Sequence, residues 1–178
     1  DDEYMDFLRT ALYQEEVFVY TPRRELKRLP KGATPLDFAF LIHTEVGQHT
    51  VGARVNGELV PLRYELRNGD TVEIITSPQA QPHEDWLKIA RTAQAKAKIR
   101  HWLRQKRLTD SVQLGKEMVL RELKRLRVKA GETELQPIAR ELECPDLDTL
   151  YARIAEGQIS VASVTRRFTP EKEGLAER

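Results

Sequence analysis

Cysteine is almost missing from this sequence, since the 178 residues contain only Cys144. A single cysteine can form neither an intrachain disulfide nor a cysteine-rich metal site, so the composition predicts a cytoplasmic location. Long apolar runs are also missing. No stretch approaches the ~20 consecutive apolar residues that cross a bilayer, which excludes a helical membrane protein and predicts no membrane partner.

Catalytic motifs are equally scarce. Gly52 and Gly57 have the spacing of a phosphate-binding loop, but Glu58 stands where that loop requires lysine, and an Asn56-Gly57 hairpin turn explains the glycines better. His83 precedes a glutamate as in zinc proteases, yet no second histidine follows at the required spacing. We therefore predict no catalytic residue, no metal and no cofactor, and no enzyme activity of this chain by itself.

Charge is unevenly distributed, although the net charge is only +1. Residues 85–130 carry fourteen Lys and Arg against four acids, whereas residues 1–16 carry one Arg and six acids. Residues 131–178 carry six basic and ten acidic side chains. Such a basic block indicates a polyanionic partner, of which nucleic acid is the commonest. The alternative is a solvated pair of helices neutralised by the acidic tail.

The first half of the chain alternates with period two and has clear turn signals. A hairpin is predicted over residues 17–29, with its turn at 21–24, and Thr34-Pro35 predicts the start of a helix over 36–43. Strands are predicted at 51–55, 59–60, 64–66 and 72–75. This β–β–α–β–β order predicts a small mixed sheet grasping one helix.

The second half is helical in its periodicity. A proline-broken polar linker at 77–82 precedes a helix that Asp85 caps and that continues to Trp102. Thr109 or Asp110 is predicted to start a second helix. Three shorter helices are predicted at 135–142, 146–155 and 160–168. Helical spacing is also present at 4–13, and residues 170–178 are predicted to be disordered.

Two kinds of side chain in these elements suggest binding. His43, at a helix end, is explained either by capping of that end or by a flat ring on a loop that stacks against a base or contacts a ribose. Trp86 and Trp102 lie among lysines and arginines, a combination typical of RNA-binding helices. The spacing of Trp86 with Ile89 favours a core position for that indole.

The N-terminal motifs closely resemble the TGS domain, through Val17–Pro22, Leu29–Ala39, Ile42-His43-Thr44-Glu45-Val46-Gly47, Val51–Gly57 and Leu66–Ile74. The following segments resemble the helical region of long RelA/SpoT stringent-response proteins, through Asp85-Trp86-Leu87, Thr92–Arg100 and Leu150–Ser160. The resemblance implies an α+β chain with a β-grasp (ubiquitin-like) TGS domain followed by an all-α domain. The implied organisation is 1–16 as the tail of a synthetase domain, 17–77 as the TGS domain, 78–84 as linker, 85–168 as the helical domain and 169–178 as a disordered tail.

The resemblance also implies a regulatory role. Long RelA/SpoT proteins make (p)ppGpp and many hydrolyse it, and their TGS domain grips the 3′ CCA end of deacylated tRNA in the ribosomal A site. The implied partners are deacylated tRNA, the ribosome with its rRNA, and the protein's own N-terminal catalytic domains. The implied contacts to the CCA end are His43, Thr44, Gln48 and His49. The expected contacts to RNA phosphates are Arg91, Lys96, Lys98, Arg100, Arg104 and Lys106.

Two positions depart from the family pattern. His49 stands where relatives often have Arg or Lys, and a neutral ring would weaken a phosphate contact. Arg24 replaces a frequent turn glycine. Two other functions stay open at this point: a module that docks on the catalytic domains and biases hydrolysis against synthesis, and a docking site for another protein, such as acyl carrier protein.

Overall fold

The computed structural model describes residues 2–5 and 15–168. The chain forms two compact units, residues 1–103 and 104–178. The division lies inside a helix rather than at the predicted 78–84 linker. Residues 2–5 are helical, whereas most of the helix predicted over 4–13, and the tail predicted to be disordered, lie outside the described residues.

The described part of the first unit contains five strands. β1 (Glu16–Tyr20) and β2 (Leu26–Pro30) form the predicted antiparallel hairpin, and β4 (Glu58–Val60), β3 (Thr50–Val55) and β5 (Val72–Thr76) form an antiparallel sheet in that order. A parallel bridge between Tyr20 and Thr71 joins the two pieces. The predicted α+β, β-grasp-like arrangement is therefore confirmed.

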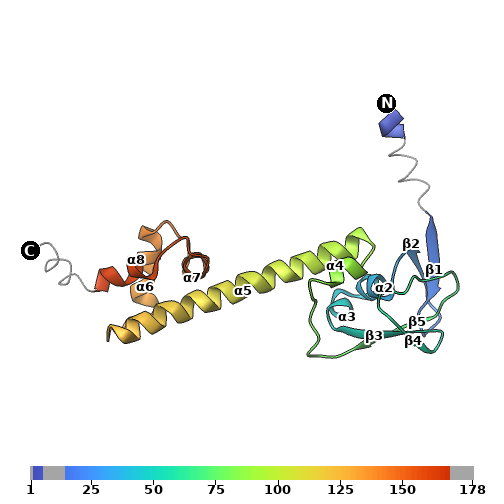
Figure 1. The fold of residues 1–178 in the computed structure, drawn as a ribbon, viewed down its shortest axis with the longest axis horizontal. Helices are drawn as coiled ribbons and strands as arrows, with labels where there is room; N and C mark the ends of the chain where they lie inside the picture. The colour runs from blue at the N-terminus through green and yellow to red at the C-terminus, as the bar shows by residue number, and fades with distance from the viewer. Residues whose placement is uncertain (1, 6–14, 169–178) are drawn as a thin grey trace, which may run out of the picture. The chain divides into compact units, whose positions relative to one another are not determined.

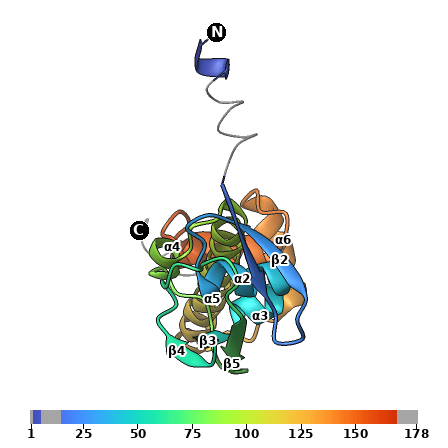
Figure 2. The ribbon, with the colours of Figure 1, turned by 90° about the vertical axis from the view of Figure 1, so that its right-hand side faces the viewer.

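One helix, α2 (Pro35–Ile42), fills the concave side of these strands and packs on β3 and β5 (Figure 2). Its buried Phe38 lies in one apolar cluster with buried side chains of both hairpin strands and of the sheet: Val17, Val19, Leu29, Val55 and Val72. The strand predicted at 64–66 is wrong. Pro61 has no N–H to continue the ladder, the Tyr64 N–H turns back to the Pro61 carbonyl, and the Leu66 N–H donates to Ala33.

Two helices replace the two that the sequence predicted between residues 85 and 126. α4 (Trp86–Ile89) ends after one turn, and α5 (Ala93–Arg125) then continues without a break (Figure 1). The predicted cap at Asp85 makes no side-chain cap bond. The predicted helix start at Thr109 or Asp110 is also wrong, because no Gly or Pro interrupts this part of α5, and Asp110 instead pairs with Lys106 one turn earlier.

The beginning of α5 belongs to the first unit through its packing. Ile99 and Trp86 are buried against Leu36 and Phe40 of α2. The Trp86 and Phe40 rings meet edge to face, with their centroids 6.4 Å apart. The predicted core position of Trp86 is therefore confirmed, whereas Trp102 is only half-buried.

The second unit contains the end of α5 and three short helices, α6 (Glu132–Glu141), α7 (Leu147–Ala155) and α8 (Val161–Thr165), followed by a 3-10 turn, η1 (Arg166–Phe168). Side-chain caps start two of these helices: Asp146 accepts from the Thr149 N–H and Ser160 from the Ser163 N–H. The core of this unit includes five fully or almost fully buried side chains: Leu123, Leu135, Leu150, Ile154 and Val164.

Gly115 lies where α5 closely approaches α7. A Cβ built on this residue would lie 2.7 Å from the Tyr151 Cα and still nearer the Tyr151 carbonyl group. The backbones of the two helices are therefore in direct contact, and only glycine leaves room for it. This explains a glycine in the interior of a helix, where it costs about 1 kcal/mol relative to alanine.

Candidate functional site

His43 lies at the junction of two helices rather than on a loop. Its extended backbone, with φ −165° and ψ 145°, ends α2 and starts a short helix that the sequence did not predict, α3 (Thr44–Gln48). The His43 N–H donates to the Ala39 carbonyl, and its own carbonyl accepts from the Gly47 N–H. One residue thus terminates one helix and caps the next.

The imidazole of His43 is oriented by its own backbone. Its Nδ1 accepts a hydrogen bond of 3.0 Å from the Glu45 N–H. Because Nδ1 then acts as an acceptor, a neutral ring carries its proton on Nε2. The side chain is exposed. His43 therefore offers solvent an N–H donor and a flat face at a fixed position. Its ring caps the start of α3, whereas only its backbone N–H closes the end of α2.

Gly47 lets α3 pack onto α2. A Cβ at this position would lie 2.7 Å from the Phe40 Cε1 and nearer still to other atoms of that ring. Phe40 is itself almost fully buried and contacts Trp86. The short helix carrying Thr44 and Gln48, both half-buried, is consequently held by the core of the first unit.

His49 is placed differently from His43. Its Nδ1 lies 3.1 Å from the Ala80 carbonyl, and its own carbonyl accepts from the Ser77 N–H. Since a carbonyl only accepts, His49 Nδ1 carries the proton, and the Nε2 of the neutral ring is an acceptor. The half-buried ring holds the 77–80 turn against the end of α3. An acceptor nitrogen would not bind a phosphate oxygen.

The six basic side chains predicted to contact phosphates fall into two groups. Lys98 donates to the Phe40 carbonyl at the end of α2, and Lys106 pairs with Asp110 at 3.0 Å. Within the described part of the chain, the other four make no ion pair; they are Arg91, Lys96, Arg100 and Arg104. Lys96 and Arg100, one turn apart on α5, share a side of that helix.

Asp37 was not predicted to have a role of its own. It is almost fully buried, and its Oδ1 accepts hydrogen bonds from the Thr92 N–H at 3.0 Å, the Thr92 hydroxyl at 2.9 Å and the Arg91 N–H at 3.0 Å. Its Oδ2 accepts from the N–H and hydroxyl of Thr34 at 2.8 and 2.9 Å. The carboxylate thus joins the N-termini of α2 and α5, where helix dipoles favour a negative charge.

The side chains at this site are of the kind that bind a ligand. Among the described residues, no three His, Cys, Asp or Glu side chains gather as metal ligands, and no helix is long and apolar enough to span a membrane. The junction of α2 and α3 presents an oriented imidazole donor, and α5 adds cations that form no ion pair with the described residues.

Family models match both parts of the chain: the TGS domain over residues 17–76 and the RelA/SpoT AH domain over residues 102–169. The chain belongs to the RelA/SpoT family. It is 40% identical over 176 residues to a GTP pyrophosphokinase of Myxococcus xanthus, covering 96% of this chain and 23% of the relative. It is 41% identical over 180 residues to the bifunctional (p)ppGpp synthase/hydrolase RelA of Mycobacterium tuberculosis, covering 97% of this chain and 24% of that protein.

A third relative is named for the opposite reaction, hydrolysis. It is a guanosine-3′,5′-bis(diphosphate) 3′-pyrophosphohydrolase of Aquifex aeolicus. The identity is 40% over 173 residues, with coverage of 96% of this chain and 24% of the relative. The RelA/SpoT chain described here therefore spans about a quarter of the length of these relatives. It corresponds to a regulatory TGS and helical region, and the activities in these names are those of the relatives.

Proposed function

We propose that this RelA/SpoT region reads the 3′ CCA end of deacylated tRNA in the ribosomal A site and so couples amino-acid starvation to (p)ppGpp synthesis. The observation that carries the proposal is His43, whose ring is oriented by Glu45 and exposes an Nε2–H donor. An N–H donor can bond a ribose hydroxyl or an adenine ring nitrogen, and its flat face can stack on a base. An aminoacyl group on the terminal ribose would occupy the same space as the His43 ring.

The cations of α5 supply the sequence-independent part of the binding. Lys96 and Arg100 are unpaired within the described residues and share one side of the helix, so they can neutralise phosphates and release counterions. With roughly five neutralised phosphates, the logarithm of the affinity should fall with the logarithm of salt concentration with a slope of about −3.5. Lys98 and Lys106 contribute less, because each already has a partner.

The whole protein, in this proposal, is a cytoplasmic enzyme that makes (p)ppGpp and can hydrolyse it. The relatives carry names of both activities, and this region matches all of them over at least nine-tenths of its length. Its partners are deacylated tRNA, the ribosome and its own catalytic domains.

The test is binding of the chain to deacylated and aminoacylated tRNA, free and in ribosomal A-site complexes. The variant His43→Glu places a carboxylate where the donor was and should abolish the preference for the free 3′ end, while His43→Gln keeps a neutral donor and should retain part of it. The matched control is His83→Glu, because His83 is also exposed and its Nδ1 also accepts a local N–H, from Asp85. Equal binding of both tRNA forms in the A-site complex would refute the proposal.

A further inference from the structure

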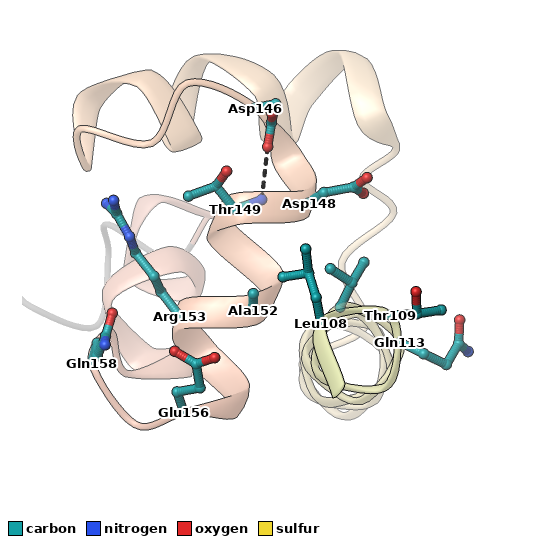
Figure 3. A pocket seen from close by; sticks show the side chains of 11 residues that line it. Leu108, Thr109, Gln113, Asp146, Asp148, Thr149, Ala152, Arg153, Glu156 and Gln158 are labelled. Carbon is teal, nitrogen blue, oxygen red and sulfur yellow. Dashed lines mark hydrogen bonds between the residues drawn. The ribbon is translucent and has the colours of Figure 1, made fainter. Parts of the chain in front are cut away.

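A groove in the second unit is not used by the proposed tRNA contacts. It lies between α5 and α7 and has a volume of about 610 Å³. Leu108 of α5 faces Ala152 of α7 across it (Figure 3). Leu108 is 51% exposed, which leaves an apolar side chain of a strongly charged helix in contact with water. With Val112, these side chains form an apolar floor.

The rim of this groove is acidic. Asp146, Asp148 and Glu156 line it, and Arg153 is the only cation among the lining residues. Arg153 does not neutralise the rim, because its guanidinium donates to the Glu143 carbonyl at 3.2 Å and its side chain points away from α5 (Figure 3). Within residues 2–5 and 15–168, neither Asp148 nor Glu156 makes a salt bridge. The groove thus has a net negative charge in a region of apolar surface.

This combination selects the kind of occupant. Carboxylates repel phosphates, so the groove cannot share the nucleic-acid ligand proposed for the TGS domain. An apolar floor between two helices accepts the apolar face of a third helix, with side chains of opposite charge toward the rim. We propose that the α5–α7 groove docks a basic amphipathic helix of a partner protein.

In this arrangement, leucine-like side chains of the partner cover Leu108 and Val112. Lysines or arginines on the flanks of the partner helix face Asp148 and Glu156, two rim carboxylates that make no salt bridge with any described residue. Asp146 contributes charge only, since its carboxylate already caps α7 through the Thr149 N–H. This proposal does not depend on tRNA reading.

The probe is a fluorescein-labelled peptide of about 14 residues, four helical turns, with lysine on one face and leucine on the other. Its control is the same peptide with glutamate in place of lysine. Fluorescence anisotropy is measured with the full 178-residue chain. The basic peptide should bind and the acidic one should not, and raising the ionic strength from about 0.05 M to about 0.5 M should weaken the binding because the charges are screened.

Variants locate the binding to the groove. Glu156→Lys should weaken it about tenfold, because attraction is replaced by repulsion while lysine remains favourable at a helix C-terminus. Leu108→Gln should weaken it about threefold or more by removing apolar contact. The matched controls, Glu84→Lys and Leu114→Gln, change equally exposed residues elsewhere and should alter the affinity less than about twofold.

Three results would overturn the proposal. The first is no binding of the basic peptide at low ionic strength. The second is equal loss of binding in the groove variants and their controls, which would mean non-specific attraction to any acidic surface. The third is competition by oligo(U) RNA: if the peptide is displaced in proportion to the RNA bound, the surface is a nucleic-acid site. Far-UV circular dichroism of Leu108→Gln and Leu114→Gln should match, since both leucines are about half exposed.

Discussion

Replacing Gly115 by alanine should destabilise the second unit although alanine is the better helix former. The helix-propensity gain in the middle of α5 would be about 1 kcal/mol. Against it stands a Cβ only 2.7 Å from the Tyr151 Cα, whereas real Cβ contacts essentially never fall below 3.0 Å. The obstructing atoms belong to the backbone of α7, so no side-chain rotation can relieve the contact.

The magnitude follows from these opposing effects. Overpacking that shifts backbone typically costs about 1–3 kcal/mol and occasionally more. Here α7 would have to move away from α5 and carry Leu150 and Ile154 with it, both buried in the core of the unit. We take the cost at the upper end, about 3 kcal/mol, which leaves a net loss of about 2 kcal/mol after the propensity gain. For a unit of this size, that lowers the melting temperature by about 8–16 °C.

Thermal and urea unfolding of the whole chain, followed by far-UV circular dichroism, measures this loss. The control is Thr109→Ala, an exposed position on the same helix where only propensity changes, and it should be neutral or slightly stabilising. If Gly115→Ala were as stable as that control, or more stable than the wild type, the close approach of α5 and α7 would be wrong.

Three further changes test other features. Asp37→Asn puts an amide donor against backbone N–H donors and should cost about 2–4 kcal/mol in urea unfolding. A cost of about 1 kcal/mol or less, the share of the Thr34 cap alone, would contradict docking of α5 on this carboxylate. Arg24→Gly should stabilise the β1–β2 hairpin by about 1 kcal/mol, because Arg24 has a φ of +68°; a lower melting temperature would contradict this. Asp146→Ala should lower the melting temperature at neutral pH, where Asp146→Asn keeps the cap. The hydrogen bond from the Thr149 backbone N–H lowers the pKa of Asp146 below that of an ordinary aspartate. The carboxylate therefore stabilises the fold at pH values above the pKa of the unfolded chain, and the gap between wild type and alanine variant should close as the pH falls through the lower, folded pKa.

Local signals were enough to predict most of the elements. The hairpin, the Thr34 cap, the Asn56-Gly57 turn and the short helices of the second unit depend on residues close in sequence, and each is present in the structure. The uninterrupted α5 was missed because a threonine or aspartate resembles a helix start even where it lies inside a helix. α3 was missed because five residues are too few to show a helical period.

The candidate site was predicted only in part. His43 came from a family motif, but the protonated nitrogen of its ring depends on the Glu45 N–H, a detail of backbone geometry. His49 and Lys98 could not be recognised as internally bonded, because their partners, Ala80 and Phe40, are 31 and 58 residues away. The same holds for Asp37, whose contacts to Arg91 and Thr92 span 54 and 55 residues.

The hydrogen bonds from Arg91 and Thr92 to Asp37 set a lower limit on the length of a TGS polypeptide that folds properly. A chain cut after residue 77 would match the family model, yet it would lose every donor that Arg91 and Thr92 supply to a buried carboxylate. It would also expose Leu36 and Phe40, which Trp86 and Ile99 now cover. The smallest autonomously folding piece should therefore extend through residue 103, and tRNA-binding studies on a shorter excised domain would measure a protein that has lost part of its core.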